Sequence, residues 1–165
     1  MATAITLISS VTVGSGTAAT IDFTSIPQTY TDLLLKFSVR RSSGGVSNIQ
    51  VTLNSGSTYQ GIRLYGGGDY VASDTTSAWG GFISGTGTDN NNTFANNELY
   101  IANYTSANKK TWAIESADEN NNSNNTLMGF SAQTWNGTGA ITSITLTHSN
   151  FAQYSTAYLY GISNA

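Results

Sequence analysis

Hydrophobic and polar residues alternate with a period of two along most of this chain, and this pattern predicts short β-strands. The clearest run covers residues 32–40, where Leu33, Leu35, Phe37 and Val39 share one parity and polar side chains take the other. Comparable runs bring the expected total to about nine strands. They cover residues 5–13, 17–23, 48–54, 98–104, 109–116, 126–135, 140–148 and 156–162.

Turn-forming clusters separate these runs, and no segment shows a capped helical stripe. The pattern predicts an all-β fold, an antiparallel β-sandwich that is jelly-roll-like, with little or no helix and a single domain over residues 1–165. We expect the polar stretch 66–97 to form long loops with one or two short strands. The clusters lie at residues 42–45, 66–68, 85–92, 119–125 and 136–139.

The first run predicts a half-buried strand, because Ile5 and Leu7 share the parity of Val11 and Val13. Apolar side chains of this strand should therefore face the core on one side.

The last run is apolar on both faces, since Tyr158 and Tyr160 lie on one side and Leu159 on the other. A strand of this kind is expected inside a sheet rather than at its edge, where trimming it would unfold the chain. We assign Tyr158, Tyr160 and Trp112 to the core.

Charged residues make up 9% of the chain, against about 25% in an average globular protein. The formal net charge is −3, and the six Lys and Arg residues are scattered, so no nucleic-acid partner is expected. There is no Cys, which excludes disulfides and thiolate chemistry. We expect no secretion signal, no membrane span and no membrane partner.

Catalytic constellations are weak, and we predict that the protein is not an enzyme. His148 is the only histidine, and its place at the end of a strand suggests an exposed side chain. Carboxylate pairs can act in glycoside hydrolysis, but acids at turns and strand edges normally just face solvent. The candidate pairs are Asp118 with Glu119 and Glu98 with Glu115.

Two oxygen-rich loops are candidate calcium sites, but neither has the spacing of a known calcium loop. They are Asp89 with Asn90, Asn91 and Asn92, and Asp118 with Glu119 and Asn120. The glycines at 66–68 lack the lysine of a phosphate-binding loop. We therefore expect no metal and no cofactor.

Aromatic residues on a polar, weakly charged background are typical of surfaces that bind proteins or sugars. Tyr65, Tyr70 and Trp79 are the predicted partner-contact residues, and Trp79, like Trp135, adjoins a loop.

Several segments together resemble a group of small β-sandwich proteins encoded by tailed phages. The group has an IP-x-TY-x-DL run before the first long strand, an Asn followed by a Tyr at the next hairpin, an I-x-NY strand, and a closing F-x-x-x-S-x-A-x-LYGI. The matching segments cover about half the chain. The matching residues are Ile26, Pro27, Thr29, Tyr30, Asp32, Leu33, Asn54, Tyr59, Ile101, Asn103, Tyr104, Phe151, Ser155, Ala157, Leu159, Tyr160, Gly161 and Ile162.

The resemblance implies a virion structural protein, made in the host cytoplasm and located in the particle. A capsid decoration (cement) protein, a homotrimer bound to the major capsid protein at the capsid surface, is the leading expectation. We expect no stalk and no coiled coil, and this expectation favours decoration over a fibre. The alternative is a tail-fibre or receptor-binding module that recognises host-surface glycan through Tyr65, Tyr70 and Trp79.

Overall fold

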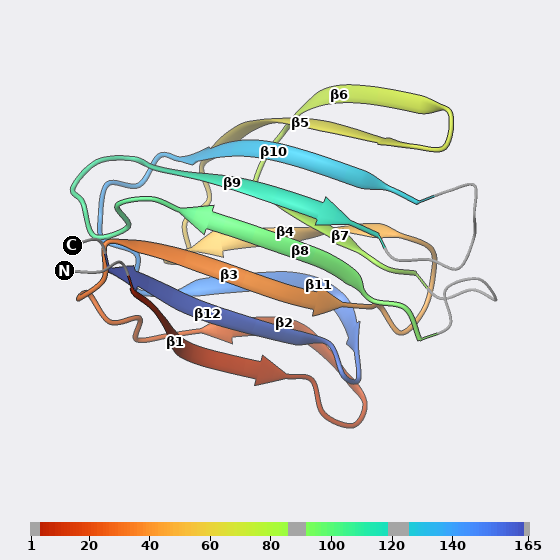
Figure 1. Cartoon of the computed structure of the whole chain (residues 1–165), viewed down its shortest axis with the longest axis horizontal. Coiled ribbons are helices and arrows are strands. Elements are labelled where there is room, and N and C mark those ends of the chain that lie inside the picture. The colour runs from red at the N-terminus through yellow and green to blue at the C-terminus, as the bar shows by residue number, and fades with distance from the viewer. Residues whose placement is uncertain (1–3, 86–91, 119–125, 164–165) are drawn as a thin grey trace.

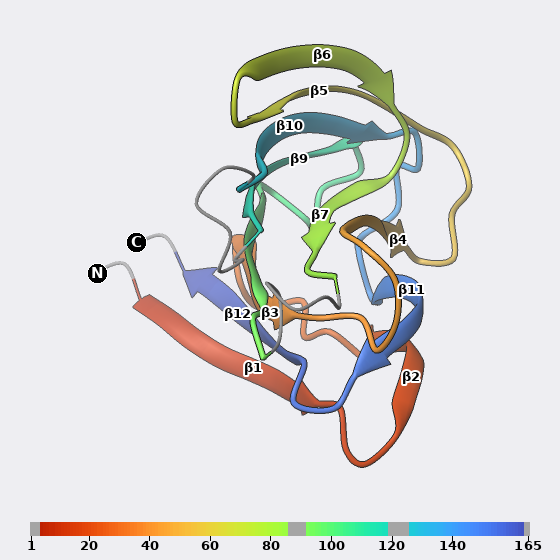
Figure 2. The same cartoon turned by 90° about the vertical axis from the view of Figure 1, so that its right-hand side faces the viewer.

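Two antiparallel sheets pack face to face in the computed structural model, which describes residues 4–85, 92–118 and 126–163 (Figures 1 and 2). The described residues contain no helix. The larger sheet has eight strands in the order β1-β12-β3-β8-β9-β10-β5-β6, and the smaller has four in the order β2-β11-β4-β7. The strands are β1 (Ala4–Thr12), β2 (Thr17–Phe23), β3 (Asp32–Val39), β4 (Ser47–Leu53), β5 (Tyr59–Gly67), β6 (Tyr70–Thr76), β7 (Trp79–Ile83), β8 (Ala95–Ile101), β9 (Lys110–Ala117), β10 (Met128–Trp135), β11 (Ile144–Ala152) and β12 (Thr156–Ser163).

The predicted all-β sandwich is confirmed, and its core lies where the alternation placed it. In β3, Leu33, Leu35, Phe37 and Val39 are all buried, while Lys36 points to solvent. Burying one such side chain stabilises the fold by roughly 1.5–3 kcal/mol. The inward faces of the two sheets together therefore supply the main stabilising contribution.

The polar stretch 66–97 holds β6 and β7, the one or two short strands that were expected there, together with the end of β5 and the start of β8. β5, which precedes it, was not predicted at all. Gly68 and Asp69 form the two-residue turn of a hairpin between β5 and β6, and Gly68 has φ +56°. Glycine is favoured at the first central position of such a turn. The glycine cluster that was predicted to form a turn therefore contributes to the turn of a hairpin.

β1 corrects the prediction about the first strand, because Ile5 and Leu7 are 62% and 51% exposed. β1 is an edge strand of the eight-stranded sheet, and its register against β12 shifts between Leu7 and Ser9. A β-bulge of this kind reverses which parity faces the core. Val11 and Val13 consequently turn inward, whereas Ile5 and Leu7 turn outward.

β12 lies between β1 and β3, so the prediction that the closing strand is interior is confirmed. Leu159 and Trp112 are buried as expected. The assignment of Tyr158 and Tyr160 to the core is wrong, because Tyr158 is exposed and Tyr160 half-buried on the outward face of the sheet. Among the strands that the structure describes, none forms a second layer over that face.

Residues of the phage-like motif meet at the end of the sandwich where β12 finishes. The Tyr104 hydroxyl donates to the Pro27 carbonyl, and the ring of Tyr30 covers Gly161. Asp32 accepts hydrogen bonds from the Tyr100 hydroxyl at 2.7 Å and from the backbone N–H of Asn103 at 2.8 Å. These motif residues hold connecting loops against strand ends, which is a structural role.

Candidate binding surfaces

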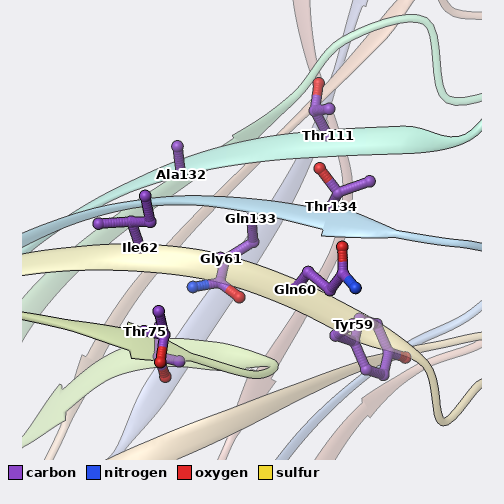
Figure 3. A pocket seen from close by; sticks show the side chains of 10 residues that line it. Tyr59, Gln60, Gly61, Ile62, Thr75, Thr111, Ala132, Gln133 and Thr134 are labelled. Carbon is purple, nitrogen blue, oxygen red and sulfur yellow. The ribbon is translucent and has the colours of Figure 1, made fainter.

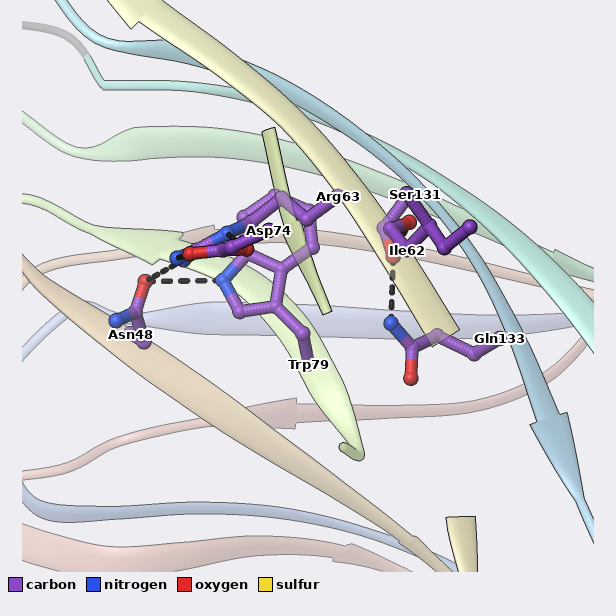
Figure 4. A network of polar contacts seen from close by, with 7 residues as sticks. All are labelled: Asn48, Ile62, Arg63, Asp74, Trp79, Ser131 and Gln133. Atoms are coloured by element: carbon purple, nitrogen blue, oxygen red, sulfur yellow. Dashed lines mark hydrogen bonds and ion pairs between the residues drawn. The ribbon is translucent and has the colours of Figure 1, made fainter. Parts of the chain in front are cut away.

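Arg63 on β5 is the centre of a cluster of aromatic and polar side chains between the two sheets (Figure 4). Its Nε and Nη2 donate to the two carboxylate oxygens of Asp74 at 3.1 and 2.6 Å, and its Nη1 donates to Asn48 Oδ1 at 3.0 Å. The guanidinium carbon lies 4.3 Å from the ring centre of Tyr65 and 5.3 Å from that of Trp79. These cation–π contacts stabilise the position of the guanidinium group in addition to its bidentate ion pair with Asp74.

Cross-strand pairing explains why this cluster forms. Arg63 and Asp74 are opposite each other in the β5–β6 pair. The hydrogen bond from Arg63 holds the pKa of the Asp74 carboxyl below its usual value. Trp79 Nε1 donates to the same Asn48 oxygen at 2.9 Å, so Asn48 on β4 links Arg63 to the smaller sheet. The cluster thus fixes the β5–β6 hairpin to the sandwich.

The structure brings the three predicted contact residues together in this cluster. The rings of Tyr65 and Tyr70 meet edge to face with centroids 6.3 Å apart. Tyr70 is 47% exposed, whereas Trp79 is 3% exposed. Trp79 therefore supports the cluster from below, and its ring offers no face to a partner. Tyr65 and Tyr70 remain the surface members.

A small pocket of about 260 Å³ adjoins the two tyrosines. Asn48, Arg63, Tyr65 and Tyr70 contribute to its lining. Aromatic rings beside amide and guanidinium donors are the groups that hold a sugar ring in many lectins, so the pocket has the chemistry for one sugar unit.

His148 is buried in β11 rather than exposed at a strand end, which corrects the sequence prediction. The strand continues to Ala152, and the imidazole makes an edge contact with Phe151 at 5.8 Å. Burial, with a smaller contribution from Arg41, lowers the pKa of His148. The neutral imidazole therefore serves as part of the packing between strands.

The nominated carboxylates fall into different environments. Glu98 and Glu115 are cross-strand partners on the exposed face of the larger sheet, and Glu98 is ion-paired with Lys36 at 2.7 Å. Asp118 is buried and accepts a hydrogen bond from Ser84 Oγ at 2.5 Å, so the expectation of a solvent-facing turn is wrong for this residue.

Most residues of the two candidate calcium loops, namely Asp89, Asn90, Asn91, Glu119 and Asn120, lie outside the described residues. Within residues 4–85, 92–118 and 126–163, no three His, Asp or Glu side chains gather into a possible metal site.

Lys110 is a buried charge that sequence reasoning missed. Its Nζ donates to the carbonyls of Ser106 at 2.7 Å and Thr138 at 3.5 Å, and also to that of Asn108. Burial lowers the pKa of this amine. The ammonium group pins two loops together, and only the folded chain reveals the carbonyls that surround it.

The outward face of the eight-stranded sheet carries two apolar areas. We call the first the tyrosine area, and it spans β1, β12, β3 and β8. Leu7, Tyr160, Leu34 and Tyr100 form one row across these four strands by direct cross-strand pairing. The area also includes the exposed side chains of Ile5 and Tyr158.

We call the second area the aliphatic ridge, and it lies on β10, β5 and β6. Its members are 55–87% exposed, and Phe130 and Leu64 at its centre are direct cross-strand partners. Outward positions of an antiparallel sheet are usually polar. The aliphatic ridge consists of Ile62, Leu64, Val71, Met128 and Phe130.

Hollows surround the ridge on the same side of the sheet. One of about 640 Å³ has Ile62, Ala132 and Thr134 in its lining (Figure 3). At its edge the buried Gln133 amide donates to Ser131 Oγ at 2.5 Å, as Figure 4 shows, and its Oε1 has no protein partner. A hollow of about 380 Å³ lies toward β9, and one of about 290 Å³ lies toward the β5–β6 turn.

No family model, curated protein or solved structure matches this chain. Among the residues that the structure describes, no helix has the length and apolarity needed to cross a membrane. The fold and its surfaces define a β-sandwich with an apolar outward face.

Proposed function

We propose that this protein is a structural protein of a tailed-phage particle, a capsid decoration protein that binds the major capsid protein and stabilises the capsid. The observation that carries the proposal is the apolar outward face of the eight-stranded sheet, where large side chains are exposed over two areas. Contiguous exposed apolar area on a soluble protein generally marks an interaction surface. The resemblance of several segments to small phage proteins is the reason for proposing that the protein is part of a phage particle.

The tyrosine area is the surface that we assign to the capsid. It combines tyrosine rings with hydroxyls and borders the Lys36–Glu98 ion pair. Interfaces between different proteins are enriched in aromatic residues and have a polar rim. Modest contacts suffice, because many copies on one lattice bind with avidity. The homotrimer implied by the resemblance belongs to the same proposal and is tested by the mass of the isolated protein.

Particles produced with and without the gene test this function by electron cryo-microscopy. We expect density on the capsid that disappears with the gene and returns when purified protein is added. Density confined to the tail, or no difference between particles, would refute the decoration role.

Two substitutions locate the capsid-binding surface. Leu7→Lys places a charge in the tyrosine area and should abolish rebinding to depleted particles. The matched control is Gln50→Lys, an exposed position on the four-stranded sheet, which should leave rebinding unchanged. Equal loss in both variants would exclude the tyrosine area.

A second candidate function is glycan recognition by a receptor-binding module, favoured by the pocket beside Tyr65 and Tyr70. A glycan array with the wild type and with Tyr70→Ala tests it. Binding that Tyr70→Ala removes would support this function, and an empty array at high protein concentration would reject it.

A further inference from the structure

We propose that the aliphatic ridge is the contact surface for a second copy of this chain, and that two copies pack these faces against each other about a two-fold axis. The inference concerns the isolated protein and does not depend on binding to a particle.

Composition separates the ridge from the tyrosine area. The outward positions of β10, β5 and β6 hold no charged residue and no tyrosine, since they are occupied by apolar, glycine, hydroxyl and amide residues. Contacts between identical subunits are more apolar than contacts between different proteins. The two charges of β5 and β6, Arg63 and Asp74, pair with each other on the inward side. Glu115 on β9 is the cross-strand partner of Phe130 and lines the hollow of about 380 Å³. A second copy therefore avoids burying an unpaired charge when it packs on β10, β5 and β6 and leaves β9 uncovered.

Projections and hollows occur on the same face, which is the requirement for self-complementary contact. Leu64 and Phe130 form the crest, and hollows of about 380 and 290 Å³ lie on its two sides. The floor toward β9 is lowered by Ala113 and Ala132, and the floor toward β6 by Gly66. A two-fold axis places the crest of each copy in the hollow of about 290 Å³ of the other, whose lining contains no charged residue, whereas Glu115 lines the hollow of about 380 Å³.

The available area reaches the lower limit of a specific interface. The three strands of the ridge, about 4.8 Å apart and seven to nine residues long, give a footprint of about 14 Å by 25 Å, or about 350 Å² in projection. Side-chain relief increases the accessible area of this footprint toward the roughly 500 Å² per partner that a weak but specific interface needs. Edge-to-edge pairing of β6 is a poorer solution, because it would extend the sheet and leave the ridge exposed.

Sedimentation equilibrium of the wild type and of Phe130→Asp tests the contact, at up to about 100 μM, where a micromolar contact is almost fully formed. We expect the mass of the variant to be half that of the wild type, because the new carboxylate would be buried against the partner copy. This ratio of two holds for a simple dimer and also where a separate three-fold contact multiplies both masses. Gln50→Asp, on the four-stranded sheet, should keep the wild-type mass.

A wild-type monomer, or equal masses for the wild type and Phe130→Asp, would overturn the proposal. Cross-linking provides a second test that does not depend on the folding of Phe130→Asp. Because the chain has no cysteine, an introduced cysteine is the sole thiol that can react. Leu64→Cys should be linked into a dimer by a bifunctional thiol reagent long enough to span a crest and the neighbouring hollow, whereas Gln50→Cys should not. Equal cross-linking at both positions would also refute the contact. The effect of Leu7→Lys on particle binding tests the capsid contact and has no bearing on the mass of the isolated protein. The capsid proposal and the dimer proposal can therefore be refuted independently.

Discussion

Adding one methyl group at Gly161 tests the packing at the end of β12. A Cβ built at this position lies 2.3 Å from two ring carbons of Tyr30 and 2.6 Å from a third. These atoms belong to the base of the ring, next to its attachment point, so rotation about the side-chain bonds cannot move them far. Gly161→Ala must therefore push the ring of Tyr30 away from the sheet.

The expected cost is the difference between two effects. Over-packing of this kind costs typically 1–3 kcal/mol. Replacing a glycine by alanine also restricts the unfolded chain and returns about 0.4–1 kcal/mol where the backbone accepts a side chain. We expect a net loss of about 1–2 kcal/mol, and a shift of about 2–4 °C in Tm per kcal/mol for a chain of this length.

Thermal and urea unfolding followed by circular dichroism measure this loss. Gly14→Ala is the matched control, because a Cβ there meets nothing within 4 Å, and it should be neutral or slightly stabilising. In a double-mutant cycle, Tyr30→Ala should relieve part of the cost of Gly161→Ala. The reasoning is refuted if Gly161→Ala is as stable as Gly14→Ala, or if the two costs are simply additive.

Three further predictions concern buried polar groups. Tyr104→Phe removes the hydroxyl that donates to the Pro27 carbonyl and should lower the unfolding free energy by about 1–2 kcal/mol in urea titrations. Because burial lowers the pKa of His148, the unfolded chain binds more protons just below about pH 6.5, so stability should fall between pH 7.5 and 5.5. A His148→Gln variant with an equally steep pH dependence would contradict this cause. The hydrogen bond to Asp32 raises the pKa of Tyr100 to about 12, and Asp32→Asn should bring it back toward 10, as ring carbon shifts in NMR titrations would report.

The alternation of apolar and polar residues was sufficient to predict the sandwich. In β3 and β8 the apolar positions are those buried under the smaller sheet, so the sequence pattern and the burial pattern agree. It failed for Tyr158, Tyr160, Ile5 and Leu7. A period of two shows that a strand has two faces, but it does not show which face is covered when one sheet has eight strands and the other four. The bulge in β1 then reverses the parity within a single strand.

The candidate cluster was predicted only in part. Composition singled out Tyr65, Tyr70 and Trp79, but it gave no reason to choose Arg63 or Asn48. Their contacts join β5 to β4, strands of different sheets, and β5 was not predicted as a strand. Contacts between residues far apart in the sequence leave no pattern in the local sequence. The burial of Lys110 was missed for the same reason.

The aliphatic ridge lies outside the phage-like motif, whereas the tyrosine area includes the motif residue Tyr160. Motif residues such as Tyr104 and Gly161 are explained by packing at strand ends. Three members of the aliphatic ridge, Ile62, Leu64 and Val71, lie in the stretch 61–93 that the motif does not cover. Exposed apolar side chains contribute little to the stability of the isolated domain, because they are in water before and after folding. We therefore expect the exposed side chains of the aliphatic ridge to contribute to stability only when they are buried against another surface, whereas packed motif residues such as Tyr104 and Gly161 already contribute in the isolated domain.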